Sequence, residues 1–222
     1  MAALECERAE RDCDTGSVTQ HYFSESPVGD ARQREIEVEL AGASRRLVTA
    51  GGVFSPEHLD EGTAVLLRTL GKLPRDAEPV AGPILDLGCG WGPIALSAAL
   101  THPEAEVWAV DINERARALT TTNATRLGLT HLRVAPPDDV PTLLQFAEIR
   151  SNPPIRIGKQ ALHALLGHWL PKLAPGGTAT LVVAKHLGAD SLQSWIAAEF
   201  PELSVTRIAR DKGFSVIQAV RV

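Results

Sequence analysis

The chain has 222 residues, of which 44% are hydrophobic and 22% are charged. This is enough apolar material for a sizeable core and too little charge for a disordered chain. No run of about 18 apolar residues occurs, which excludes a membrane-spanning helix. The formal net charge of −5 argues against a protein that coats nucleic acid non-specifically, although it leaves room for a local basic face.

Residues 1–18 are polar almost throughout, and we expect them to form a disordered arm. They lack the apolar segment of a signal peptide, which favours a cytoplasmic location. Cys6 and Cys13 lie in this arm and Cys89 lies in a glycine-rich turn. Three cysteines give no even disulfide framework, and a redox pair of Cys6 and Cys13 is the alternative. No Cys or His residues have the spacing of a zinc site, so we expect no metal.

Residues 19–75 are predicted to form a small N-terminal lid. Residues 34–40 alternate charged and apolar side chains, which is typical of a half-buried strand, and residues 45–49 form a second short strand of the same hairpin. Ser55 and Pro56 have the pattern of a helix N-cap followed by proline at the first helical position. Residues 72–82 contain proline and are interpreted as a linker. The helical spacing that follows Pro56 is carried by Leu59, Thr63, Leu66, Leu67 and Leu70.

Residues 83–222 alternate predicted strands and helices and are expected to form the catalytic domain. Strands are predicted at 84–87, 106–110, 131–135, 146–150, 178–184, 203–209 and 214–220, and helices at 93–100, 113–127, 162–173 and 189–200. Asn113 is the expected cap of the second of these helices. Repeated strand–helix units predict an α/β fold with a doubly wound, mostly parallel, seven-stranded Rossmann-like sheet that ends in an antiparallel hairpin.

A glycine-rich turn joins the first of these strands to its helix, with the sequence Asp86-Leu87-Gly88-Cys89-Gly90-Trp91-Gly92-Pro93. Glycines let the backbone approach a ligand, and the helix that follows has free N–H groups at its start. Pro93 stands where a dinucleotide fingerprint needs its third glycine, which disfavours a nicotinamide enzyme. Asp111 ends the next strand, where its two oxygens can bind both hydroxyls of a ribose. The pattern predicts a ribose-bearing cofactor, and a tight turn without a ligand is the alternative.

A second motif, Ser151-Asn152-Pro153-Pro154-Ile155, follows the fourth strand of the domain. The two prolines stiffen the loop, and Asn152 is extended because a proline follows it. The side-chain oxygen of Asn152 and a nearby backbone carbonyl can both accept hydrogen bonds from an exocyclic amine. Such an arrangement aims the nitrogen lone pair at a methyl donor, and methyl transfer needs orientation more than a strong base. An ordinary loop is the alternative interpretation.

These motifs resemble those of class I methyltransferases that use S-adenosylmethionine. Residues 84–92 are similar to the first motif of that class, and Asp111 is similar to its ribose-binding acid. The resemblance implies that the turn glycines line the methionine and ribose portions of the cofactor and that Asp138 contacts the adenine. An ordinary turn role for Asp138 stays open. The implied cofactor-binding residues are Phe54, Asp86, Gly88, Gly90, Gly92, Asp111, Ile112, Asp138 and Asn152.

A narrower resemblance is to the bacterial ribosomal RNA guanine-N2 methyltransferases, the small-subunit type C enzymes and their large-subunit relative. It is carried by the Asn-Pro-Pro motif and by residues 21–24, 52–55, 59–63, 151–159 and 212–216. It implies Asn152, Pro153 and Pro154 as catalytic residues, and Ile155, Arg156 and Lys159 as substrate contacts. Ile155 departs from the usual Phe or Tyr that stacks on the target, so we expect either that another aromatic such as Trp91 or Phe54 compensates or that the target is held differently. The better-known members carry a duplicated N-terminal domain, which we do not expect here, so docking of the substrate by that domain is not carried over.

The resemblance implies methylation of an exocyclic amine, with guanine N2 of 16S-type ribosomal RNA as the first choice. The alternatives are adenine N6, a protein glutamine amide, or a catalytically silent module that binds cofactor or RNA. The expected partner is ribosomal RNA or a ribosomal subunit, without a membrane, and a monomer is favoured. Trp169 and Trp195 are expected in the core. Basic residues near the cleft would contact phosphates or be solvated surface charges, and they are Arg150, Arg156, Lys159, Lys185 and His186.

Overall fold

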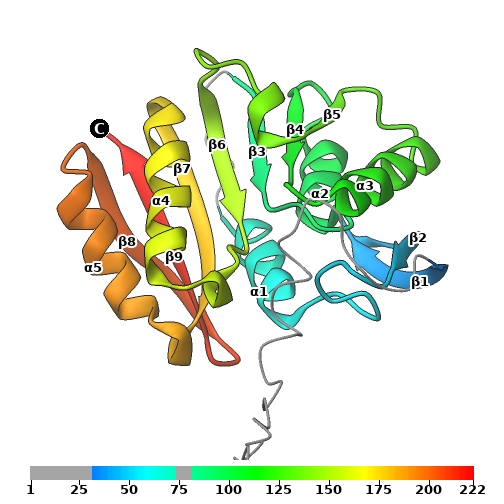
Figure 1. The fold of residues 1–222 in the computed structure, drawn as a ribbon, viewed down its shortest axis with the longest axis horizontal. Helices are drawn as coiled ribbons and strands as arrows, with labels where there is room; N and C mark the ends of the chain where they lie inside the picture. The colour runs from blue at the N-terminus through cyan, green and yellow to red at the C-terminus, as the bar shows by residue number, and fades with distance from the viewer. Residues whose placement is uncertain (1–31, 74–81) are drawn as a thin grey trace, which may run out of the picture.

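The structure, a computed structural model, describes residues 32–73 and 82–222. Its centre is a seven-stranded sheet in the order β5-β4-β3-β6-β7-β9-β8 (Figure 1). β3 to β7 are parallel to one another, whereas β9 runs antiparallel to both β7 and β8. The strands are β3 (Ile84–Leu87), β4 (Val107–Val110), β5 (Leu132–Ala135), β6 (Phe146–Ser151), β7 (Leu173–Ala184), β8 (Leu203–Asp211) and β9 (Phe214–Arg221).

Helices cover both faces of this sheet, as a doubly wound fold requires. On one face, α4 (Lys159–Trp169) and α5 (Ala189–Glu199) pack on the largest apolar cluster, which contains Leu85 and Leu87. On the other face lie α1 (Glu61–Leu70), α2 (Pro93–Thr101) and α3 (Glu114–Arg126). β3 is buried on both faces, because helices cover the sheet on each side. Its residues point alternately to the two faces, and Ile84 packs on the α2 side. The predicted fold class is confirmed.

The N-terminal hairpin is also confirmed. β1 (Gln33–Leu40) and β2 (Ala43–Ala50) pair antiparallel, and Gln33 faces Ala50. The hairpin is fastened to α3 by Asn123, whose side chain accepts from the Val48 backbone N–H at 2.7 Å and donates to the Val48 carbonyl at 2.9 Å. In Figure 1 the hairpin and α1 lie together at the end of the sheet toward which the β6 arrow points. They therefore border the carboxyl ends of the parallel strands.

The prediction that a helix begins at Ser55 and Pro56 is wrong. Ser55 has a φ of +46°, which is incompatible with an N-cap, and α1 begins at Glu61. The cap is Asp60, whose side chain accepts a hydrogen bond from the Thr63 backbone N–H at 2.9 Å. A carboxylate in this position satisfies an otherwise unpaired N–H of the first turn. The apolar side of α1, with Val65 and Leu66, then packs on the sheet beside Val182 and Val216.

Most of the other expected elements are found within a few residues of their predicted limits. Asn113 caps α3, since its side-chain oxygen accepts from the backbone N–H groups of Arg115 and Ala116. β7 begins earlier than expected, at Leu173. Trp169 is buried as expected, whereas Trp195 is only half-buried and stacks on His163 with ring centroids 3.6 Å apart.

Several predictions concern residues outside the described ranges. The disordered arm at 1–18 with Cys6 and Cys13, the motif at 21–24 and most of the 72–82 linker belong to this group. The division into a lid at 19–75 and a catalytic domain at 83–222 stays a prediction. Over the two ranges that are described, no helix combines the length and apolarity needed to cross a bilayer.

Candidate active site

The glycine-rich turn leaves β3 and enters α2 with its backbone held against β4. The backbone N–H groups of Gly88 and Cys89 both donate to the Val110 carbonyl, at 2.8 and 3.1 Å. Gly88 and Gly90 have positive φ angles, and no heavy atom lies within 4 Å of where a Cβ would stand on either. These two glycines therefore border open space in which a ligand can approach the backbone.

Gly92 needs to be glycine for a different reason. It is buried, it caps α2 with a φ of +98°, and a Cβ there would lie 2.9 Å from Thr120 Oγ1. The absence of a side chain lets the turn pack against α3. Its predicted contact with a cofactor stays a prediction.

Asp111 lies at the end of β4 and contacts the glycine turn directly. Its Oδ2 accepts from the Gly90 backbone N–H, and its Oδ1 accepts from the Asn113 backbone N–H, both at 2.9 Å. Burial raises the pKa of this carboxyl, and the two backbone hydrogen bonds partly oppose that effect. Each carboxylate oxygen can accept about two hydrogen bonds, so one position on each remains for a ligand donor. This arrangement fits a ribose with two adjacent hydroxyls.

Asp86 is buried below the same turn. Its Oδ2 accepts from the Ala95 backbone N–H of α2 at 2.9 Å, whereas its Oδ1 has no hydrogen-bond partner in the structure. Burial raises the pKa of Asp86 to about 8, and the charge of Asp111 adds to that effect. The carboxyl of Asp86 therefore holds its proton at neutral pH. Cys89 beside it is also buried, and burial raises the pKa of its thiol.

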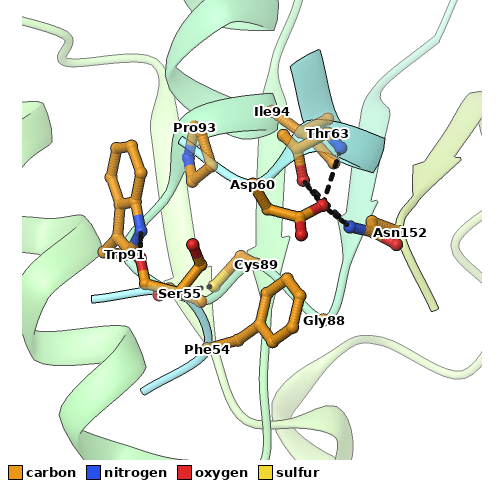
Figure 2. A pocket seen from close by; sticks show the side chains of 11 residues that line it. Phe54, Ser55, Asp60, Thr63, Gly88, Cys89, Trp91, Pro93, Ile94 and Asn152 are labelled. Carbon is orange, nitrogen blue, oxygen red and sulfur yellow. Dashed lines mark hydrogen bonds between the residues drawn. The ribbon is translucent and has the colours of Figure 1, made fainter. Parts of the chain in front are cut away.

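The Asn-Pro-Pro loop follows β6, next to β3 in the sheet. Ser151 is buried and donates from its hydroxyl to the Leu87 carbonyl at 2.6 Å, which ties the loop to the start of the glycine turn. The Asn152 side-chain nitrogen donates to Asp60 Oδ2 at 2.8 Å and to Thr63 Oγ1 at 3.0 Å. Asn152 is thus held between β6 and the start of α1, as Figure 2 shows.

A pocket gathers these elements. Trp91 forms one side of it and donates from Nε1 to the Ser55 carbonyl at 3.1 Å, and the Phe54 ring lies close to Cys89 and Gly88 (Figure 2). The Phe54 side chain is exposed, which is unusual for a large apolar residue. The lining residues are Phe54, Ser55, Asp60, Thr63, Gly88, Cys89, Gly90, Trp91, Pro93, Ile94 and Asn152.

The remaining predicted site residues are not among those that line this pocket. Ile112 is exposed immediately after Asp111, and Asp138 is exposed in the short 3-10 helix Pro137–Asp139 after β5. Ile155 is half-buried and packs against the main apolar cluster, and Lys159 is exposed at the start of α4. Pro153 is buried and Pro154 is half-buried. Arg156 lies in the 3-10 helix Ile155–Ile157.

Arg150 is not available to phosphates. Its side chain is only 6% exposed and its guanidinium pairs with Glu148 at 2.6 Å. The sequence pattern places Arg150 near a strand end, but its side chain is buried, and a buried positive charge needs a carboxylate partner. Lys185 and His186 are exposed in the 3-10 helix that follows β7.

Sequence reasoning missed Asp60 and Thr63 as site residues. The available signal was an N-cap pattern, in which an Asp precedes a helix and bonds to the residue three positions later. The prediction of a helix start at Ser55 hid that pattern. In the described ranges, no three His, Cys, Asp or Glu side chains gather as a metal site would need.

Comparison with known proteins gives the family of the chain. The family model of the methyltransferase small domain matches residues 44–218. The chain belongs to the methyltransferase small domain family. The resemblance to methyltransferases that was stated from the sequence is thereby confirmed, whereas the Asn-Pro-Pro motif stays a prediction. Two solved structures with this fold are described with AdoMet or SAM bound.

The chain is similar in sequence to two kinds of curated relatives. The chain is 32% identical over 208 residues to the uncharacterized protein YbxB of Bacillus subtilis, which it covers completely. It is 28% identical over 216 residues to the ribosomal RNA small subunit methyltransferase C of Pseudomonas syringae, of which it covers 61%. The chain therefore spans only part of the methyltransferase C relatives.

The fold is also shared with a solved structure, the T. thermophilus 16S rRNA N2 methyltransferase RsmC in complex with AdoMet and guanosine. The TM-score is 0.73 at 22% identity, over 86% of this chain and 51% of that one. At this level of identity the likeness shows the fold alone.

Proposed function

We propose that this chain binds S-adenosylmethionine and methylates an exocyclic amine, with guanine N2 of ribosomal RNA as its target. The observation that carries the proposal is the position of Asn152 in one pocket with Gly88 and Gly90. A group that can hold an amine thus lies beside a backbone cradle that can hold a cofactor. The names of the methyltransferase C relatives support ribosomal RNA as the substrate.

The cofactor site is assigned from the residues that fit it. Gly88 and Gly90 leave open space at the turn, and the free lone pairs of Asp111 match two ribose hydroxyls. Ile112 is exposed beside Asp111 and offers an apolar surface for a flat ring. Phe54 lines the same pocket as Gly88 and Gly90. When bound, S-adenosylmethionine supplies a methyl group on a sulfonium, which is already activated for transfer.

Asn152 then acts by orientation. Its side-chain oxygen accepts a hydrogen bond from the target amine and directs the nitrogen lone pair along the line of displacement. The amine nitrogen bonds to the methyl carbon as the carbon–sulfur bond breaks, and the methylated nitrogen loses one hydrogen to solvent as a proton. Pro153 and Pro154 hold the loop in one conformation, which lowers the entropy lost on alignment.

The substrate side of the site is assigned to Ile155, Arg156 and Lys159. Ile155 packs on the core and offers an aliphatic edge where relatives of this type have a stacking ring. The exposed ring of Phe54 is available to stack on the target base, which is worth about 1–3 kcal/mol per base. Lys159 and Lys185 supply positive charge for phosphates at the carboxyl end of the sheet.

A protein glutamine amide is the second candidate, and Ile155 is the observation that favours it, because an amide needs no stacking ring. One experiment separates the two. Purified protein is incubated with labelled S-adenosylmethionine and ribosomes from cells that lack the protein, the RNA and protein fractions are separated, and the RNA is digested to nucleosides. Label in N2-methylguanosine supports the proposal. Label in protein, or in another nucleoside, contradicts it.

A further inference from the structure

The side-chain amide of Asn152 is held by two partners that come from one turn of α1. Its nitrogen carries two hydrogens, and both are used, one by Asp60 Oδ2 at 2.8 Å and one by Thr63 Oγ1 at 3.0 Å. The nitrogen of Asn152 therefore has no hydrogen left for a substrate, and only its oxygen is available to receive one. Figure 2 shows this oxygen turned away from Asp60.

We propose that Asp60 and Thr63 are positioning residues that fix the amide of Asn152 with its oxygen toward the substrate. This inference rests on the proposed function, in which Asn152 holds the target amine. It adds a specificity rule to that function. A site that presents only an acceptor selects a nucleophile that carries hydrogen, and it rejects ring nitrogens that carry none.

The acceptor oxygen of Asp60 decides the orientation, because it has no hydrogen to donate. Turning the amide of Asn152 over would place its oxygen against the Asp60 carboxylate oxygen, two acceptors at hydrogen-bond distance with no hydrogen between them. Thr63 alone would not prevent this, because a hydroxyl can either donate or accept. In the observed arrangement the Thr63 hydroxyl accepts from Asn152 and lies 3.5 Å from Asp60 Oδ2, to which it donates.

The same carboxylate oxygen also caps α1 by accepting from the Thr63 backbone N–H at 2.9 Å. Loss of Asp60 would therefore affect helix stability as well as Asn152. The two effects can be separated, because serine is as good an N-cap as aspartate but has a shorter side chain. Asp60→Ser is expected to keep the cap and lose the contact with Asn152. Asp60→Asn is expected to keep both, because its side-chain oxygen can take the place of Oδ2.

The test measures methyl transfer to ribosomal RNA, cofactor affinity and thermal unfolding for Asp60→Ser, Asp60→Asn and the pair Thr63→Val and Thr63→Ser. We expect Asp60→Ser and Thr63→Val to lower kcat by about tenfold or more, with cofactor affinity and unfolding temperature nearly unchanged. Asp60→Asn and Thr63→Ser should recover most of the activity. Asp60→Ser with wild-type kcat would overturn the inference.

A double-mutant cycle distinguishes this inference from the proposed function itself. If Asp60 acts through Asn152, then adding Asp60→Ser to Asn152→Ala should lower kcat by less than about twofold further. Full additivity would show that Asp60 acts elsewhere, while Asn152 would keep its role. If Asn152→Ala alone left activity intact, the proposed function would fail at this site.

A spectroscopic measurement tests the positioning without any substrate. The two Nδ2 hydrogens of Asn152 should be protected from exchange with solvent in the wild-type protein, because both are hydrogen-bonded. Their protection should be lost in Asp60→Ser and kept in Asp60→Asn, as measured by NMR of a nitrogen-labelled protein. Equal protection in both variants would contradict the inference.

Discussion

Asp86 is a buried carboxyl whose pKa of about 8 makes the stability of the protein depend on pH. The folded state keeps this proton up to about pH 8, whereas the unfolded chain releases it near its ordinary value of 3.8. The stabilisation from this group is therefore fully present below the pKa of Asp86 in the unfolded chain. It is lost as the pH rises from there through the pKa of Asp86 in the folded protein.

Replacing Asp86 with asparagine removes this titration and keeps an oxygen that can accept from the Ala95 backbone N–H. We expect the free energy of unfolding of Asp86→Asn, relative to the wild type, to increase from about pH 5 to about pH 9. Urea unfolding at several pH values measures it. A difference between the two proteins that does not change with pH would show that Asp86 is ionised throughout.

Asp111 tests the cofactor side of the site. Asp111→Ala removes the acceptors for both ribose hydroxyls, each worth about 1 kcal/mol or more, so we expect affinity for S-adenosylmethionine to fall by about 30-fold. Calorimetric titration measures it, with NAD as the control ligand and thermal unfolding as the check on folding. Unchanged affinity in the variant, or binding of NAD alone to the wild type, would contradict the assignment of a ribose site.

At the residue scale, the sequence predicted where candidate residues lie along the chain, and their roles toward a ligand stay predictions. Asp111 and the glycines at 88 and 90 were expected beside a ligand because strand ends and chain reversals are local features. The partners of Asn152 were not predictable in the same way. Asp60 and Asn152 are far apart in the sequence, and only the packing of α1 against the carboxyl ends of the strands brings them together.

At the scale of elements, a buried polar residue of α3 holds the backbone of the hairpin β1–β2. Asn123 is fully buried and bonds to both backbone groups of Val48 and to the Trp91 carbonyl. Asn123→Ala would leave these buried groups unpaired, and each costs about 1–3 kcal/mol. We therefore expect a loss of about 3 kcal/mol or more in the free energy of unfolding.

The matched control for this change is Thr121→Ala on the same helix. Thr121 is exposed and its hydroxyl bonds only to the Arg117 carbonyl of its own helix. We expect its effect to be within about 0.5 kcal/mol. Denaturant unfolding of both variants gives the comparison. Equal stability of the two would show that the hairpin is held by its apolar contacts alone.

Strand positions were well predicted because buried parallel strands have short apolar runs, as in the four residues of β4. The start of α1 was mispredicted for a physical reason. A serine followed by a proline is typical of a helix start. In the structure, however, the Ser55 carbonyl accepts a hydrogen bond from the Trp91 indole, and the helix begins only after its N-cap Asp60. A local sequence pattern cannot show that a residue distant in the sequence, here Trp91, hydrogen-bonds to the backbone carbonyl at the expected helix start.

At the scale of the whole molecule, the proposed RNA substrate requires a local basic face on a chain whose net charge is −5. Lys159 at the start of α4 and Lys185 after β7 are exposed at the carboxyl ends of neighbouring strands. We expect Lys159→Ala and Lys185→Ala each to weaken RNA binding and to reduce the slope of its salt dependence by about one.

Lys172 is the control for this prediction. It lies just before β7, at the opposite end of that strand from Lys185, and its side chain donates to the Thr142 carbonyl. Binding of ribosomal RNA is measured at several salt concentrations for the three variants. If Lys172→Ala changed the slope as much as the other two, binding would be spread over the surface and the proposed face would be wrong.

The doubly wound, mostly parallel sheet could be predicted from the sequence, because repeated strand–helix units restrict how parallel strands connect. The way the N-terminal segment closes over the sheet was not. Its hairpin packs on α3 and its helix α1 on β7 and β9. One side of the pocket therefore comes from Phe54 to Thr63, which precede Gly88 by 34 to 25 positions (88 − 54 and 88 − 63). Such long-range packing leaves no periodic signal in the sequence.

The central claim is that Asn152 orients the target amine and does not contribute to binding of the cofactor. Single-turnover methyl transfer from labelled S-adenosylmethionine to ribosomal RNA, measured beside cofactor titration for the wild type and Asn152→Ala, tests it most directly. We expect turnover to fall by about a hundredfold or more while cofactor affinity stays nearly unchanged, because the contact of Asn152 is realised when nitrogen and methyl group align. Near-normal turnover in the variant would show that Asn152 is only a loop residue.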